Sequence, residues 1–300
     1  MTEPDDWPPL FQPEEFAPLS ATVKVDFGAY SRPGRTRVVN EDHYLILQLG
    51  RHQKTLMTSL PDAAISPRFD EYGYAMVVAD GMGGTGAGEA ASHLAIATLV
   101  LLVRQFGKWK LRVDDVEAQD IMARAERFYR HVDAAVIQQR RKGAVDTGQT
   151  TLTATFGAGH DLFFAHVGHS RAYLHRRGQL MRLTRDHTIH PNQSTSVPTA
   201  PLVDVNDAAK DLKHTLTNTI GMSGPLGPKI DLERILLEDD DRVLVCTNGL
   251  TDSVDEDTIG KILSLDHSAD LQCQALVGLA MSAASKDDVT ALVARYRFPQ

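Results

Sequence analysis

Residues 74–92 constrain the fold and chemistry of this 300-residue chain more than any other stretch. The stretch opens with an apolar run, residues 74–79, in which the β-branched Val77 and Val78 predict a buried strand. Asp80 follows, and then a glycine-rich loop that leads into a helix rich in Ala and Leu. Because glycines let the backbone turn tightly and approach a ligand, the stretch predicts a carboxylate at a strand end beside an open loop.

Three interpretations of this stretch compete. Residues 81–86 (GMGGTG) match the G-x-G-x-x-G pattern of a dinucleotide site. Asp80 would then place a negative charge against the pyrophosphate, and a second long helix follows where a βαβ unit needs a strand. A carboxylate beside open glycines is better interpreted as a metal ligand. The structural alternative is a tight turn with a capping Asp, and the stretch alone does not decide between these last two.

Composition excludes several classes of protein. With 42% hydrophobic and 23% charged residues, the chain can bury roughly three quarters of its unfolded surface in one large or two small domains. A net charge of −8 argues against nucleic-acid and anionic-membrane partners. Two cysteines provide neither a disulfide framework nor a Cys-based zinc site. We find no apolar run near the roughly 20 residues of a membrane span, so we expect a soluble, cytoplasmic protein.

The chain is expected to contain one structured domain. Residues 1–19 are acidic, carry five prolines and are expected to be an extended lead-in. Residues 20–300 form the predicted domain, in which residues 186–216 lack periodicity and are expected to form a flap. Strands are predicted at residues 21–29, 43–49, 74–79, 150–158, 161–167, 171–177, 179–183, 242–247 and 289–296, and helices at 90–106, 116–141, 255–263 and 269–284. The short strands joined by glycine turns predict antiparallel pairing, and residues 51–72 predict a hairpin excursion.

Oxygen-bearing side chains recur at the edges of these predicted strands. They are Asp42, Asp80, Asn248 and Asp287, with Glu41 next to the first. Several such positions in one chain favour strands that converge on an oxygen-lined centre, which suits a magnesium- or manganese-type ion. Arg37 is predicted to project toward this centre as an anion clamp.

The ordered motifs resemble a bacterial member of the metal-dependent protein serine/threonine phosphatases, the type-2C or PPM family, over roughly residues 21–297. The residues that carry the resemblance are Gly34-x-x-Arg37-x-x-Asn40-Glu41-Asp42, Asp80-Gly81-Met82-Gly83-Gly84, Gly168-His169-Ser170-Arg171, Asp186-His187, Asn248-Gly249-Leu250 and Asp287-Asp288-x-Thr290. The resemblance implies an α+β fold: a four-layer α-β-β-α sandwich of two antiparallel sheets flanked by helices. It also implies two Mn²⁺ or Mg²⁺ ions at one end of the sandwich.

The resemblance assigns roles at this centre. Asp80 would bridge the two ions, and Gly81 would offer its backbone carbonyl. Asp42 with Glu41 would serve the second ion, and Arg37 would bind the phosphate. Asn248 and Asp287 would serve the first ion, and His169 is a candidate ligand of a third.

The implied activity is hydrolysis of phosphoserine and phosphothreonine in proteins by a hydroxide that bridges the metals. The substrates would be proteins marked by a bacterial serine/threonine kinase, and the chain is expected to act as a monomer. Some relatives have His where Met82 follows Asp80-Gly81, so no general acid is assigned.

Three positions depart from the family pattern. The family usually has Asp where Asn248 stands, Asn where Asp288 stands and Asp where His169 stands. We hypothesise that Asn248 and Asp288 are a compensating exchange that keeps the charge of the centre constant. The same departures favour the alternative function, a catalytically impaired relative that binds phosphoproteins or a regulator.

Overall fold

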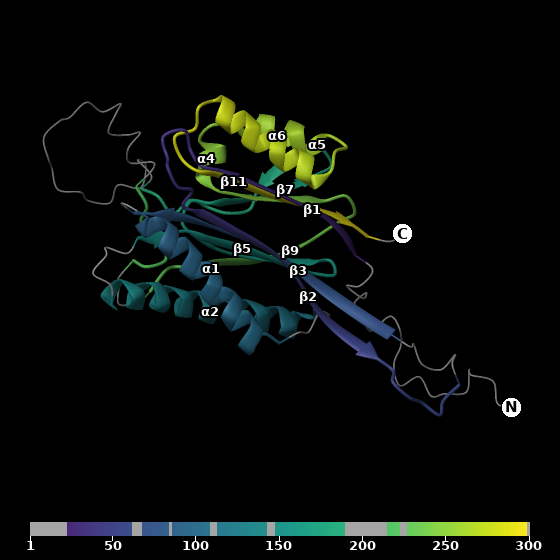
Figure 1. The fold of residues 1–300 in the computed structure, drawn as a ribbon. Helices are drawn as coiled ribbons and strands as arrows, with labels where there is room; N and C mark the ends of the chain where they lie inside the picture. The colour runs from purple at the N-terminus through teal and green to yellow at the C-terminus, as the bar shows by residue number, and fades with distance from the viewer. Residues whose placement is uncertain are drawn as a thin grey trace, which may run out of the picture.

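The computed structural model describes residues 23–61, 68–83, 86–108, 113–142, 148–189, 215–222 and 227–298. The predicted lead-in at residues 1–19 and most of the predicted flap at 186–216 lie outside these ranges. The described residues form two antiparallel sheets, each covered on its outer face by helices (Figure 1).

The first sheet contains, in spatial order, β1 (Lys24–Arg32), β11 (Val289–Arg297), β10 (Arg242–Cys246), β7 (Arg171–Arg176) and β8 (Gln179–Arg182). The second contains, in spatial order, β2 (Asp42–Lys54), β3 (Arg68–Met82), β5 (Leu152–Ala158), β6 (Asp161–Val167) and β9 (Asp231–Leu236), with β4 (Gln149–Thr150) paired to the end of β3. All of these pairs are antiparallel, so the dinucleotide interpretation is wrong: β3 lies between β2 and β5 and belongs to no parallel βαβ unit.

The alternation of side chains along β3 explains why helices cover the outer face of this sheet. Val77 and Val78 are neighbours on β3 and point to opposite faces, as successive strand residues must. Val78 packs between the sheets, whereas Val77 packs against α1 (Ala87–Phe106) and α2 (Asp115–Lys142). The outer face of the first sheet is covered by α5 (Glu256–Ser264) and α6 (Ala269–Ser282). The predicted four-layer sandwich is therefore confirmed.

Several predicted boundaries are right, and some elements were missed. Helix α1 ends at Phe106, where the Gly107 N–H bonds the carbonyl of Val103. The predicted hairpin excursion is formed by the far ends of β2 and β3, which pair with each other as far as Lys54 and Arg68. This part projects beyond the sheet, because β5 pairs only with residues 73–78 of β3. The sequence did not predict β9 or the short helix α4 (Asn248–Thr251).

Helix α1 corrects the expectation about apolar runs. Within the described ranges it is the one helix that is long and apolar enough, by length and composition, to cross a membrane. The structure gives this composition a different reason, because α1 packs along β3 on one side and α2 on another.

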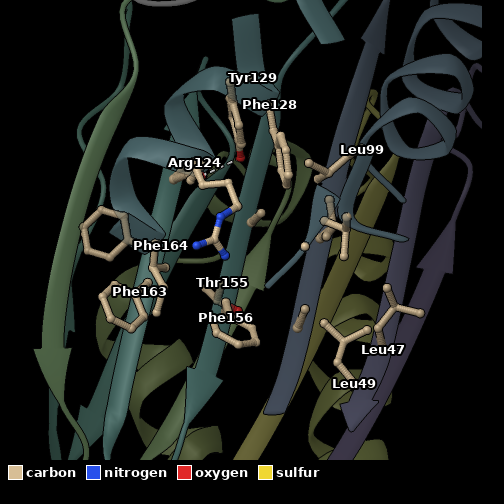
Figure 2. Close-up of a pocket in the computed structure, with 18 of the residues that line it drawn as sticks. Leu47, Leu49, Leu99, Arg124, Phe128, Tyr129, Thr155, Phe156, Phe163 and Phe164 are labelled. Carbon is tan, nitrogen blue, oxygen red and sulfur yellow. Dashed lines mark hydrogen bonds between the residues drawn. The ribbon is translucent and has the colours of Figure 1, made fainter. Parts of the chain in front are cut away.

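A cavity of about 150 Å³ lies between α1, α2 and the outer face of the second sheet. Its walls are almost wholly apolar and include Leu47, Leu99 and Phe156. Figure 2 shows the guanidinium of Arg124 reaching across it. Arg124 is buried and ion-paired with Asp120, so its charge is balanced within α2.

Candidate metal centre

Asp42 and Asp80 stand directly opposite each other on paired strands. The antiparallel register of β2 and β3 aligns these two residues, and the Gly81 N–H donates to the Glu41 carbonyl 3.2 Å away. Directly opposed side chains in such a pair lie within contact distance. Two acids there repel each other, so this register is favourable only where something offsets the charge.

The carboxylate of Asp42 is buried and half satisfied. Its Oδ2 accepts hydrogen bonds from the Thr247 and Thr290 hydroxyls at 2.8 and 2.7 Å. Its Oδ1 is buried and has no hydrogen-bond partner. Burial raises the pKa of Asp42 to about 7, against the effect of the two threonines and with help from Asp288 and Asp287. An oxygen left alone in this way is suited to a cation.

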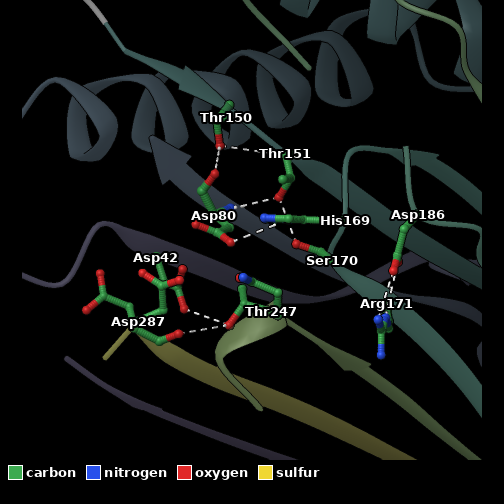
Figure 3. Close-up of polar contacts among 12 residues, drawn as sticks. Asp42, Asp80, Thr150, Thr151, His169, Ser170, Arg171, Asp186, Thr247 and Asp287 are labelled. Carbon is green, nitrogen blue, oxygen red and sulfur yellow. Dashed lines mark hydrogen bonds and ion pairs between the residues drawn. The ribbon is translucent and has the colours of Figure 1, made fainter. Parts of the chain in front are cut away.

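The backbone of Asp80 is held on both sides of its side chain. Its N–H donates to Thr151 Oγ1 at 3.0 Å, and its carbonyl accepts from the Thr150 hydroxyl and the Thr151 N–H, both at 2.9 Å. Burial and the neighbouring charges of Asp42 and Asp287 raise the pKa of Asp80 well above its usual value. Figure 3 shows Asp80, Asp42 and Asp287 around one space.

His169 lies against Asp80. Its Nδ1 is 3.8 Å from Asp80 Oδ2, and the residue is 8% exposed. The structure thus places the candidate third-ion ligand beside the residue expected to bridge the other two.

Gly81 can only be glycine. A Cβ there would lie 2.2 Å from the carbonyl oxygen of Gly88 and 2.7 Å from that of Glu41. Both are backbone atoms, so a change of side-chain rotamer cannot relieve the clash. The close approach presses β3, the start of α1 and the end of the 34–41 loop together beside Asp80.

Arg37 bridges the remaining acids. Its Nη1 donates to Glu41 Oε2 and its Nη2 to Asp287 Oδ1, both at 2.8 Å. Glu41 is buried, which raises its pKa, and the charge of Arg37 partly opposes that rise. Arg37 therefore lies at the centre and pairs with two of the acids there.

Asn248 opens α4 rather than ending a strand. Its Nδ2 donates to Asp252 Oδ2 at 3.1 Å across one helical turn. This contact orients the amide and leaves Oδ1 as the atom able to act as a metal ligand. Asp252 thus orients a candidate ligand.

Asp288 has a role that the sequence did not suggest. Its two oxygens accept from the backbone N–H groups of Gly34 and Glu41 at 2.8 and 2.7 Å. It therefore fixes both ends of the loop that carries Arg37.

The donor set fits an oxygen-preferring divalent ion. It combines carboxylates, an amide oxygen and the Gly81 carbonyl, and it includes the buried, unpartnered Asp42 Oδ1. In the described part of the chain, no three His, Cys, Asp or Glu side chains are already arranged to hold an ion. Two of the acids, Glu41 and Asp287, are instead paired with the guanidinium of Arg37.

Sequence reasoning assigned no role to the two threonines that support Asp42. Thr247 and Thr290 hold Asp42, and they also bond each other through the Thr290 N–H and Thr247 Oγ1 at 3.0 Å. Thr247 follows the buried strand β10 and Thr290 is the second residue of β11, so a hydroxyl beside each ligand motif was the available signal. Asp186 and His187 fix the start of the predicted flap: Asp186 pairs with Arg171 and His187 with Asp231.

Comparison with known proteins agrees with this geometry. The Protein phosphatase 2C family profile matches residues 58–276, which is more than half of the chain. The chain belongs to the protein phosphatase 2C family.

Similar proteins occur in several bacteria. The serine/threonine protein phosphatase PstP of Mycobacterium tuberculosis is 31% identical over 230 residues, which cover 73% of this chain and 40% of PstP. The serine/threonine phosphatase Stp of Listeria welshimeri is 28% identical over 221 residues, covering 73% of this chain and 82% of Stp. The structure of the PstP catalytic domain in complex with two manganese ions matches with a TM-score of 0.65 at 26% identity, over 92% of this chain and 100% of that domain.

Proposed function

We propose that this chain hydrolyses phosphoserine and phosphothreonine in proteins, with two Mn²⁺ or Mg²⁺ ions at the centre built around Asp42 and Asp80. The observation that carries the proposal is the opposed pair itself. Two carboxylates face each other across paired strands, and the buried Oδ1 of Asp42 has no hydrogen-bond partner. Family membership and the Stp and PstP relatives support the same activity.

Each candidate ligand has a place in this proposal. Asp80 would bridge the ions beside the Gly81 carbonyl, and Asp42 with Glu41 would hold one of them. Asn248 and Asp287 would hold the other. When bound, two divalent cations would neutralise the phosphoryl oxygens and lower the pKa of a water molecule.

The chain's own residues would do the rest. Thr247 and Thr290 both donate to Asp42 Oδ2 and so fix the orientation of the carboxylate, including its unbonded Oδ1. Arg37 lies on a loop that Asp288 holds at both ends, and its planar fork suits two phosphoryl oxygens. Glu41 and Asp287 hold that guanidinium at the centre in this structure.

Finer features are also proposals. His169, 3.8 Å from Asp80, would take part in holding a third ion. The substrates would be proteins phosphorylated by a bacterial serine/threonine kinase, and the chain would act as a cytoplasmic monomer. Met82 has no acidic proton, so this position offers no general acid for the leaving group.

A phosphopeptide assay with and without Mn²⁺ tests the proposal. We expect Mn²⁺-dependent release of phosphate, abolished by Asp80→Asn and retained by Asp255→Asn, which removes a carboxylate that caps α5. Calorimetric titration with Mn²⁺ should show weaker binding for Asp80→Asn. Binding of Mn²⁺ without turnover by the unsubstituted chain would instead support the catalytically impaired alternative.

A further inference from the structure

A row of basic side chains crosses the first sheet at the end away from the metal centre. His175 on β7, Arg242 on β10 and Arg295 on β11 are aligned partners in the antiparallel register. Arg297 lies two residues further along β11 and so shares this face. Together with Arg177, these residues line a pocket beside the end of α5. In Figure 1 this is the end of β11 that leads to the C-terminus.

The arginines share few carboxylates. Asp240 Oδ1 lies 2.7 Å from Arg295 Nε and 3.0 Å from Arg297 Nη1 and is shared by these two ion pairs. Its other oxygen, Oδ2, is 3.6 Å from Arg242 Nη1. Asp266 contacts Arg295 at 2.7 Å, but its side chain is 87% exposed. Solvent weakens an ion pair at such an exposed carboxylate.

The other charges of the pocket are engaged elsewhere. Arg177 pairs with Glu238 at 2.5 Å. Asp239 also lines the pocket, and its Oδ1 accepts the backbone N–H of Phe298 at 2.9 Å. Glu238 and Asp239 therefore both bond groups other than Arg242.

Arg242 is the least compensated member of the row. Its side chain is 6% exposed, its nearest carboxylate oxygen is 3.6 Å away, and its Nε–H is buried with no hydrogen-bond partner. Beside it, His175 bonds Ser264 through Nε2 at 2.9 Å, while its Nδ1 is buried and without a partner. A buried cation with an unmade hydrogen bond is unfavourable unless a ligand completes it.

Burial and neighbouring cations both disfavour the charged forms of Arg242 and His175. Burial together with the charges of Arg295 and Arg297 lowers the pKa of Arg242, although Asp240 opposes the shift. Burial and the charge of Arg242 likewise lower the pKa of His175. For both groups burial is the larger cause, and the neighbouring arginines add to it.

We propose that this pocket binds a phosphate group, with the guanidiniums of Arg242, Arg295 and Arg297 as its donors. Guanidinium forks match the oxygens of a phosphate better than a point charge does. The site is separate from the metal centre. β10 runs from Arg242 to Cys246, near Asn248, and β11 runs from Val289, beside Asp288, to Arg297. The two sites are therefore joined by roughly 13 Å of β10 and roughly 26 Å of β11.

Phosphate binding to the whole chain in EDTA tests the proposal without catalysis, because no metal ion is then present to hold phosphate. The readouts are calorimetry and the ¹⁵N resonances of the Arg side chains. We expect inorganic phosphate to shift the Arg242 Nε–H resonance, whereas potassium chloride at equal ionic strength should not. Shifts confined to the 34–42 loop, or equal shifts with chloride, would overturn the proposal.

Three variants sharpen the test. Arg242→Met should weaken phosphate binding about ten-fold, corresponding to the loss of about 1.4 kcal/mol. Because Arg242 is buried, Arg297→Gln serves as a second variant: its side chain is 46% exposed, and we expect a loss of a few-fold. Arg130→Met, on the exposed face of α2, is the matched control and should bind as the unsubstituted chain does. If folded Arg242→Met and Arg297→Gln both bind phosphate unchanged, the assignment is wrong.

A phosphoserine peptide distinguishes the source of the phosphate. Tighter binding than inorganic phosphate, lost in Arg242→Met, would assign the pocket to a phosphorylated protein. Binding no tighter than inorganic phosphate, with the same sensitivity to Arg242→Met, would assign it to the free ion, which is the product of the proposed reaction.

Discussion

Asp42 and Asp80 occupy facing positions of β2 and β3, and threonine hydroxyls donate to the carboxylate of Asp42 but to the backbone carbonyl of Asp80. The arrangement has a cost, since burial and mutual repulsion raise the pKa of both groups. Cations would remove that cost, so residues that hold the pair in place should matter both for stability and for metal binding.

The threonines on Asp42 provide the first test. We expect Thr247→Val to lower the free energy of unfolding by about 1.5–3 kcal/mol, because a buried hydrogen bond to a carboxylate is lost with little change in volume. Urea denaturation of the metal-free chain measures this. Thr258→Val removes a comparable bond to Asp255 on the surface and should cost less than about 1 kcal/mol. If the two variants lost the same free energy of unfolding, the buried bond to Asp42 would contribute no more than the surface bond to Asp255.

Two glycines should respond to alanine with opposite signs. Gly81→Ala places a Cβ 2.2 Å from a backbone oxygen, so we expect a loss of at least about 3 kcal/mol together with weaker Mn²⁺ binding. Gly278→Ala, inside α6, meets nothing within 4 Å and should stabilise by about 0.5–1 kcal/mol through helix propensity. Thermal unfolding of both variants measures the difference. A neutral Gly81→Ala would contradict the close packing of β3 against α1.

Asp288 tests the compensating-exchange hypothesis against the contacts in the structure. An amide at this position can accept from only one of the Gly34 and Glu41 N–H groups, so Asp288→Asn should cost about 1–3 kcal/mol even without metal. Compensation instead predicts that Asn248→Asp restores the Mn²⁺ affinity lost in Asp288→Asn. Mn²⁺ titration of both single variants and the double variant decides between them, and additive effects would count against compensation.

The sequence predicted what depends on local pattern. Alternating strands, helix periodicity and the strand-edge positions of Asp42 and Asp80 could all be read along the chain, and the motif order added the sandwich. The hydrogen bonds to Asp42 could not be predicted in this way. Thr247 and Thr290 lie more than 200 residues away from it along the chain and reach it only because the two sheets pack together. The sharing of Arg37 between two acids likewise depends on how distant loops meet.

A buried histidine should make stability depend on pH. His166 Nε2 lies 3.0 Å from the Arg185 carbonyl and must donate to it, so Nε2 carries the proton and Nδ1 accepts from the Thr153 hydroxyl at 2.8 Å. Burial, with a contribution from His187, lowers its pKa to about 3.

Between the unfolded value of about 6.5 and this folded value, the unfolded chain binds a proton that the folded chain does not. Stability from this group is therefore complete above pH 6.5 and falls on acidification toward pH 3, with a slope of at most about 1.4 kcal/mol per pH unit. His166→Gln keeps an acceptor and a donor but cannot titrate, so its stability should fall less steeply between pH 7 and 5. Urea denaturation of the metal-free chain at several pH values measures the slope. The exposed His131→Gln is the control and should retain the original slope, and an unchanged slope in His166→Gln would show that other groups account for the acid sensitivity.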